Sequence, residues 1–444
     1  MTSTDKHSPP ASGAGTRPAG DASRVDTSIP VVVLAWAHGS QDASSGSGAL
    51  GVARTLGRLG VPAYLVHDRG VLPVSFSRYW KGTFAWDPSA PPDESLRFLA
   101  EIGRRAGGRP LLLQTTDPAA IFVADHAGVL EERFEFPRVS PTLIRGLANK
   151  WQMFLAAKQS GVPTPETILP RSRDDVVRFL DEGGARFPLL LKGADPLGPG
   201  RWTMKIVHTA RDLLELYERA GTPGVPDVMI QEYIPGGDDA VWMCNAYFDR
   251  QSECRAVFTG RKLRQWPAHT GVASLAICAP NETVAETTRR FMKAVGYQGP
   301  VGIGYRYDAR DGLYKLLDIN ARVSGVFRLF TAPNGMDVVR VCYLDLTGQA
   351  IPPFSPRAGR KWMLEEDVLT AATYVREGKL TPWQWLASLR GVEETQWFWR
   401  DDPVPGLVWC WKRLPYAERS CWRMKRLVEM PWRRMRRALG APHA

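Results

Sequence analysis

Two polar residues in the segment "LLDINAR" (316–322) have the spacing of a metal site. Asp318 and Asn320 stand two positions apart in an apolar run, and side chains two apart in a strand lie on the same face. Their oxygens are the ligands that Mg²⁺ prefers, and the guanidinium of Arg322 could bind a phosphate group through paired hydrogen bonds. A strand that runs into an ordinary polar turn would show the same residues, so the rest of the chain must decide.

Two lysines earlier in the chain could neutralise phosphate charge as compact cations. Lys150 lies in the predicted helix 140–161, and Lys192 ends the apolar segment "PLLLK". A glycine-rich loop follows Lys192, and a further segment, "IQEYIPGGDD" (230–239), leads from a strand into a turn with two acids. Each feature alone has an ordinary explanation: a solvated helix face, a lysine that extends to solvent or a simple turn.

The elements that would position these residues follow two patterns. Between Ser28 and about Ser140, apolar strand-like segments alternate with amphipathic helical segments, which predicts a doubly wound α/β unit. From Pro141 the order of helices, strands and a hairpin is mixed, which predicts an α+β unit whose sheet need not be parallel. The hairpin is the segment "VGIGYRYDARDGLYKLLDIN" (301–320).

The first unit contains a GxGxxG motif, formed by Gly46, Gly48 and Gly51, and Asp68 ends its second predicted strand. This pattern is typical of a dinucleotide site when a tight turn joins the first strand to the motif. Here the mostly polar or small residues 37–45 intervene. We therefore favour close packing of a small-residue helix, and a dinucleotide-dependent oxidoreductase remains an alternative.

Taken together and in this order, the two lysines, the glycine-rich loop, "IQEYIPGGDD" and "LLDINAR" resemble the ATP-grasp superfamily, specifically its carboxylate–amine ligase-like branch. The resemblance covers about Val31 to Gly348. It implies a chain of α/β and α+β units: a Rossmann-like pre-ATP-grasp domain at 28–140, then a two-subdomain ATP-grasp domain at 141–350. The lid subdomain would lie at about 150–233.

The resemblance also implies an activity. The protein would be an ATP-dependent ligase that joins a small-molecule carboxylate to an amine through an acyl-phosphate intermediate, with ATP and Mg²⁺. Lys262, in "FTGRKLRQWP", looks like a third phosphate-binding cation. Arg322 would hold the transferred phosphate, and Asp318 and Asn320 would be Mg²⁺ ligands.

The implied nucleotide site draws on three segments. The two lysines would bind phosphates under a flexible lid, residues 231–234 would line the adenine, and one of two acids would accept the ribose hydroxyls. The residues implied are Lys150, Lys192, Gly193, Gly198, Gly200, Gln231, Glu232, Tyr233, Ile234, Asp238 and Asp239.

One expected residue is missing. Members of the superfamily usually carry a second metal-binding carboxylate on the strand before Asp318. If the hairpin pairs Asp308 with Leu313, Asp318 faces Ile303 or Gly304, and Asp308 lies about 16 Å further along at ~3.3 Å per residue. The expected position is then filled by Gly302, Ile303 or Gly304. Either Mg²⁺ has fewer protein ligands, or the protein binds ATP with little or no catalysis and acts as a membrane-tethered regulator.

Composition sets outer limits. With 444 residues, 44% hydrophobic and 23% charged, the chain is globular and long enough for two or three domains. It has no apolar run of ~18 residues, and its Ser-, Pro-, Gly- and Ala-rich residues 1–27 predict a disordered tail rather than a secretory signal. Six cysteines without a CxxC pair favour a reducing cytoplasm and argue against disulfides or zinc.

The C-terminal segment 351–444 predicts a helical, Trp-rich and basic extension. Ten Lys or Arg and two Glu follow Pro403, so +8 of the net charge of +11 lies there. Apolar residues recur at helical spacing between Met424 and Leu439, with basic residues between them and Pro431 as a kink. This pattern suits an interfacial helix on an anionic membrane; a helix docked on protein is the alternative, and nucleic-acid binding is not favoured.

Overall fold

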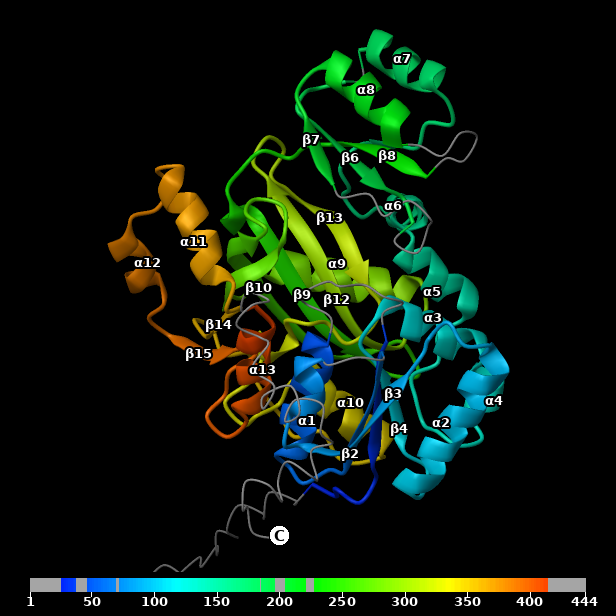
Figure 1. The fold of residues 1–444 in the computed structure, drawn as a ribbon. Helices are drawn as coiled ribbons and strands as arrows, with labels where there is room; N and C mark the ends of the chain where they lie inside the picture. Colours follow the sequence, from blue (N-terminus) through cyan, green and yellow to red (C-terminus); the bar gives the residue numbers. More distant parts are fainter. Residues whose placement is uncertain are drawn as a thin grey trace, which may run out of the picture.

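The computed structural model describes residues 25–36, 46–68, 72–183, 185–195, 204–220 and 227–413. These residues form three β-sheets, of four, seven and four strands. Figure 1 shows the small third sheet at the top, the large sheet in the middle and the first sheet below it. No described helix is long and apolar enough to cross a membrane.

The first sheet is parallel, with strand order β3-β2-β1-β4. Its inner strands are runs of buried apolar residues because helices cover both faces. The edge strand β3 alternates between buried and more exposed residues and was not predicted. The elements are β1 (Val31–Ala35), α1 (Ser47–Gly57), β2 (Ala63–Asp68), β3 (Trp80–Trp86), α2 (Pro92–Ala106), β4 (Leu111–Gln114), α3 (Asp117–Asp125) and α4 (Ala127–Leu130).

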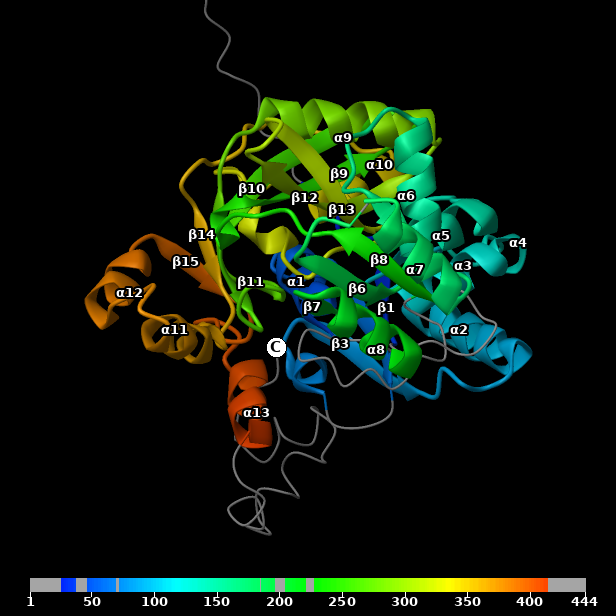
Figure 2. The same ribbon diagram turned by 90° about the horizontal axis from the view of Figure 1, so that it is seen from above.

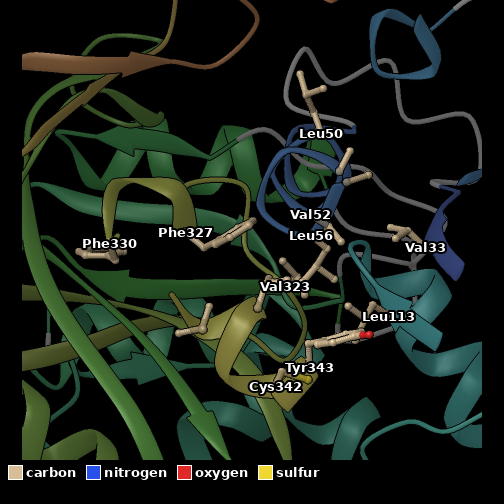
Figure 3. Packing of buried hydrophobic residues seen from close by; sticks show 14 of the residues in the cluster. Val33, Leu50, Val52, Leu56, Leu113, Val323, Phe327, Phe330, Cys342 and Tyr343 are labelled. Atoms are coloured by element: carbon tan, nitrogen blue, oxygen red, sulfur yellow. The ribbon is translucent and has the colours of Figure 1, made fainter. Parts of the chain in front are cut away.

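The small residues of α1 allow close packing against the segment that follows "LLDINAR". A Cβ atom on Gly51 would lie 2.5 Å from Cε1 of Phe327, and one on Gly48 would lie 3.2 Å from the carbonyl oxygen of Val323. Figure 3 shows Leu50, Val323 and Phe327 in the shared core. The GxGxxG motif is therefore covered by protein, as close packing predicted, although its partner is mainly this segment rather than the sheet.

Replacing Gly51 by Ala is expected to destabilise the protein by about 1–3 kcal/mol, because the added methyl group overpacks the contact with Phe327. Gly146 is a matched control, since it also lies in a helix but a Cβ there would meet nothing within 4 Å. Gly146→Ala should stabilise the protein by up to about 1 kcal/mol. Urea unfolding measures both, and equal shifts for the two variants would contradict the packing.

The large sheet has the order β13-β12-β9-β10-β11-β14-β15. It is antiparallel except for the pair β14–β15, as the mixed element order allowed. The helix α9 packs on one face, and α10 and the first unit pack on the other. The elements are β9 (Val241–Phe248), β10 (Cys254–Trp266), β11 (Val272–Cys278), α9 (Glu282–Ala294), β12 (Gly299–Asp308), β13 (Leu313–Asn320), α10 (Val338–Leu346), β14 (Lys361–Met363) and β15 (Val392–Thr395).

The small sheet has the order β5-β8-β6-β7, and α7 and α8 cover one of its faces. Both views place it beside β13 of the large sheet (Figures 1 and 2). The elements are α5 (Pro141–Ala148), α6 (Lys150–Gln159), β5 (Thr167–Ile168), α7 (Arg173–Asp181), β6 (Leu189–Gly193), β7 (Lys205–Val207), α8 (Ala210–Ala220) and β8 (Val228–Glu232).

The single helix predicted for 140–161 is wrong, because the chain breaks at Asn149. Its backbone is extended, and its side-chain oxygen accepts hydrogen bonds from the amides of Trp151 and Gln152. An Asn at this position competes with the helical backbone and starts a new helix. The break places Lys150 in the first turn of α6.

The ends of the chain also differ from the expectations. After residue 350 the helices α11 (Asp367–Arg376), α12 (Pro382–Ser388) and α13 (Val404–Arg413) are accompanied by β14 and β15, which extend the large sheet. Residues 414–444, and with them the predicted interfacial helix, lie outside the described residues. In the segment predicted as a tail, the amide of Asp26 donates to Oε1 of Gln349 at 2.7 Å, so residues 25–27 are packed.

Candidate functional site

Lys192 points away from the helices of the small sheet. Leu189, Leu191, Val228 and Ile230 pack against α7 and α8, so the alternate residues of β6 and β8 lie on the opposite face. Lys192 is on this second face, opposite Met229. The lysine is 8% exposed, and this face looks toward the large sheet.

The facing surface of the large sheet carries the other charged candidates. In β12, Val301 and Ile303 pack against α9, so Gly302 and Gly304 lie on the other face. An irregularity in the pairing between β12 and β13 turns Asp318, opposite Gly304, and Asn320, opposite Gly302, to this same face. We call the space between this face and Lys192 the cleft.

Burial and neighbouring charges tie Lys192 to two other candidates. The pKa of Lys192 is lowered to about 8, chiefly by desolvation on burial and also by the nearby Lys150, while Asp318 acts to raise it. The amide of Lys150 donates to the carbonyl of Ala194 at 2.8 Å, which holds α6 against the end of β6. The structure therefore brings Lys150, Lys192 and Asp318 together across the cleft.

Lys262 reaches the cleft from β10. Its pKa is lowered to about 8 by desolvation, while Asp238 and Asp318 raise it. Its ammonium group donates to Oε1 of Gln265 at 3.0 Å and to the carbonyl of Gly271 at 2.8 Å. Lys192 and Lys262 thus interact with the carboxylate of Asp318, with Lys150 beside Lys192, and the positive charge would suit a polyphosphate.

The four residues predicted around the adenine have different environments. The side chain of Gln231 is buried and donates to Thr167 at 2.8 Å. The carboxylate of Glu232 accepts from Arg310 at 2.6 Å and lies 3.6 Å from the ammonium of Lys315, so it joins the small sheet to the β12–β13 hairpin. The carbonyl of Ile234 accepts from Nε of Arg306 at 2.8 Å.

The two ribose candidates are now distinguishable. Asp238 is 8% exposed, accepts from Nε2 of Gln265 at 2.9 Å and also accepts from the hydroxyl of Tyr374 in α11. Asp239 is 65% exposed and lies 3.8 Å from the guanidinium of Arg261. Asp239 has more free acceptor capacity, whereas Asp238 fixes β10 and α11 to the edge of the cleft.

Asp318 begins a chain of hydrogen-bonded side chains. Its Oδ2 accepts from Nδ2 of Asn320 at 3.1 Å, and Oδ1 of Asn320 accepts from Nη2 of Arg322 at 2.8 Å. Nε of Arg322 donates to Oδ1 of Asp117 at 2.8 Å. Asp117 is the first residue of α3, in the first unit. It was missed in the sequence, where its place just after β4, at the carboxyl end of a parallel strand, was the available signal.

The hairpin register follows the expected pattern. Asp308 pairs with Leu313, and Asp318 pairs with Gly304. Asp308 binds Arg310 and Lys315 at 2.8 and 2.7 Å, which together hold its pKa below its usual range.

At Gly302, one of the three candidate positions for the missing acid, the structure leaves no room for a side chain. A Cβ atom on Gly302 would lie 2.7 Å from Cβ of Ser324, so that position admits no side chain without a rearrangement. The hydroxyl of Ser324 donates to Oδ1 of Asn245 at 2.5 Å. Neutral groups therefore fill the space beside Gly302.

The lid glycines are only partly described. Gly193 ends β6, and Gly198 and Gly200 lie outside the described residues.

The geometry defines a class of protein. A parallel first unit, a small antiparallel sheet and a large antiparallel sheet, with charged side chains facing one another between the last two, form the ATP-grasp fold. Solved structures that share this arrangement confirm the predicted fold. N5-carboxyaminoimidazole synthetase from Staphylococcus aureus, solved with ADP, matches 79% of this chain and 86% of its own with a TM-score of 0.57 and 12% identity. L-amino acid ligase from Bacillus licheniformis matches 74% and 75% with a TM-score of 0.51 and 14% identity.

Among curated proteins, the chain is similar to D-aspartate ligase from Enterococcus faecium (strain Aus0004). The two are 29% identical over 255 residues, which is 55% of this chain and 60% of that protein. A shorter match joins the chain to the carbamoyl phosphate synthase large chain of Methanosarcina acetivorans, at 22% over 200 residues, or 43% of this chain and 18% of that protein. The chain thus spans less than two thirds of the length of each of these relatives. No protein-family model matches it.

Proposed function

We propose that this protein is an ATP-dependent carboxylate–amine ligase that works through an acyl-phosphate. The observation that carries the proposal is the placement of Lys192 and Lys262 near Asp318, with Lys150 beside Lys192, in a cleft between two sheets. Such an arrangement neutralises and positions a polyphosphate, which is most of what a protein contributes to phosphoryl transfer.

In the proposed reaction, a carboxylate oxygen attacks the γ-phosphorus of ATP and ADP leaves. The amine nitrogen then attacks the acyl carbon, the C–O bond to phosphate breaks, and the nitrogen loses a proton to form the amide. The three lysines would hold the phosphates, and Arg322, bonded to Asn320 and Asp117, would hold the transferred phosphoryl group. Gln231 to Ile234 would contact the adenine, and Asp239 is the better ribose ligand.

The oxygens of Asp318 and Asn320 fit a hard cation. Within the described ranges, no group of three or more His, Cys, Asp or Glu could hold a metal, so Mg²⁺ would complete its shell with phosphate oxygens and water. When bound, the ion supplies positive charge to the phosphates.

The relatives support this class of reaction and suggest substrates. D-aspartate ligase and L-amino acid ligase are named for ligating amino acids. D-aspartate is therefore the first carboxylate to test. Hydroxylamine is a suitable first amine, because it is small and converts acyl-phosphates to hydroxamates.

The test is ADP release from ATP–Mg²⁺ in the presence of hydroxylamine and mixed carboxylates. We expect substrate-dependent ADP and hydroxamate, lost in Lys192→Ala and kept in Lys205→Ala, which removes an exposed lysine from the same sheet. Thermal stabilisation by ATP–Mg²⁺ without any turnover would instead identify a non-catalytic nucleotide-binding protein. Stabilisation by NAD(H) but not ATP would favour the oxidoreductase alternative.

The affinity for ADP is expected to fall as the pH rises above about 8. The pKa values of Lys192 and Lys262 are lowered from 10.5 to about 8, so each ammonium group that must bind phosphate requires proton uptake above that pH. The affinity should fall by up to about tenfold per pH unit for each such lysine. The free energy of unfolding of the free protein should instead rise between pH about 8 and 10.5, because the unfolded chain binds more protons than the folded chain over that range.

Titration of ADP–Mg²⁺ by calorimetry between pH 7 and 9.5 measures this dependence. In buffers of different ionisation enthalpy, the same titration reports proton uptake at pH about 8.5 and none at pH 6.5. Lys192→Arg should remove one of the two contributions, because arginine stays charged. An affinity that is constant from pH 7.5 to 9.5 would contradict the low lysine pKa values.

A further inference from the structure

A series of hydrogen-bonded side chains starts at Asp318 in the cleft and ends at Asp117 in the first unit. Asp318, Asn320, Arg322 and Asp117 are linked by hydrogen bonds of 3.1, 2.8 and 2.8 Å. Its first member lies among the three lysines, and its last member belongs to the first unit. The proposed function uses the chain only as far as Arg322, and Asp117 has no role in it.

The two ends of this chain differ in charge. The Asp318 end is dominated by Lys150, Lys192 and Lys262, which suits phosphates. At the other end a carboxylate lies beyond Arg322, and Asp117 is 29% exposed while Arg322 is 17% exposed. If Arg322 holds an anionic group of the substrate, the carboxylate of Asp117 lies on the other side of the guanidinium.

Asp117 also keeps acceptor capacity. Arg322 approaches Oδ1 with Nε at 2.8 Å and Oδ2 with Nη2 at 3.4 Å. A carboxylate has about four lone-pair sites, so two donors leave room for further N–H groups. An ammonium group is a fitting partner, since it brings three donors and a positive charge.

We propose that the carboxylate substrate is an amino acid, and that Asp117 binds its ammonium group while Arg322 faces its reacting carboxylate. This inference rests on the proposed ligase function and names the substrate class. The carboxylate of the amino acid would meet the guanidinium of Arg322, and its ammonium group would meet the carboxylate of Asp117. Asp117 is then a specificity residue contributed by the first unit.

A purely positioning role for Asp117 makes a different prediction. If Asp117 only holds Arg322, its loss should slow all carboxylates equally, whether or not they carry an ammonium group. If Asp117 binds the ammonium group, its loss should affect only the substrates that have one. The ratio of kcat/KM for matched pairs therefore separates the two roles.

The experiment compares amino acids with analogues that lack the amino group: D- and L-aspartate with succinate, and D- and L-alanine with propionate. ADP release is measured with ATP–Mg²⁺ and hydroxylamine. In the wild-type protein, the best amino acid should exceed its analogue in kcat/KM by about 10²-fold or more. In Asp117→Asn, which keeps an oxygen for Arg322, the ratio should fall to within about tenfold, through a higher KM for the amino acid.

Asp125→Asn is the matched control, because Asp125 lies at the other end of α3 and pairs with Arg145. This variant should keep the wild-type ratio. A wild-type ratio near one, or an unchanged ratio in Asp117→Asn, would overturn the inference and leave the ligase proposal intact. Absence of ADP release with every carboxylate would instead overturn the ligase proposal and this inference with it.

Discussion

Replacing Asp318 by Asn is expected to lower substrate-dependent ADP release by about 10²–10³-fold, the usual cost of removing one charged group aimed at the reacting phosphates. Asp318 is the acid that interacts with both Lys192 and Lys262. Its neighbour Asn320 is neutral, and the position beside them is closed by Ser324. Nothing nearby on this face of β12 can therefore replace the lost carboxylate as a Mg²⁺ ligand.

The measurement is steady-state ADP release over a range of Mg²⁺ concentrations, together with thermal stabilisation by ADP with and without Mg²⁺. Asp318→Asn should keep stabilisation by ADP alone and lose the increment due to Mg²⁺. Asp93→Asn, at an exposed position in α2, should behave as wild type. More than a tenth of the wild-type activity in Asp318→Asn would show that the metal ligands lie elsewhere.

The fold could be predicted where it depends on local pattern. The buried strands β1, β2 and β4 read as continuous apolar runs, and the pairing of Asp308 with Leu313 followed from the turn between them, although the sequence left Asp318 opposite either Ile303 or Gly304. The order of the lysines and acids was sufficient to identify the ATP-grasp fold. These features need only short-range information.

The features that were missed depend on contacts between distant segments. Asp117 and Arg322 are 205 positions apart, and neither position shows its partner in the sequence. The strand β14 has only three residues, and it forms because β11 offers a free edge. The carboxylate of Glu232 pairs with Arg310, 78 positions away, and the sequence gives no sign of that pair.

The segment after residue 350 is joined to the cleft by polar contacts. Tyr374 donates to Asp238, and Nε2 of His269 lies 2.9 Å from the carboxylate of Glu377. Arg264, two residues after Lys262 in β10, forms a salt bridge to Asp367 at 2.7 Å. The C-terminal helices thus support the strand that carries Lys262, whereas the sequence predicted only a helical extension.

Asp367→Ala is expected to destabilise the protein by about 3–5 kcal/mol, because it leaves the guanidinium of Arg264 buried without its partner. The two side chains are 6% and 0% exposed, and Asp367 also accepts from Ser274 at 2.9 Å and Trp385 at 3.1 Å. Glu215→Ala, which breaks the exposed pair with Arg211, should cost under about 0.5 kcal/mol. Urea unfolding measures both changes.

A second variant separates two effects of Asp367→Ala: the loss of the charge that pairs with Arg264, and the loss of side-chain volume. In Arg264→Met/Asp367→Leu the buried charges are replaced together, and most of the stability should return, because apolar residues can substitute for a buried ion pair at little cost. If the double variant is as unstable as Asp367→Ala, packing rather than charge controls this interface. Arg264 and Lys262 both lie in β10, so the double variant also tests the cleft. If it is stable and still binds ADP, the C-terminal helices support the cleft through packing and the ion pair is not needed.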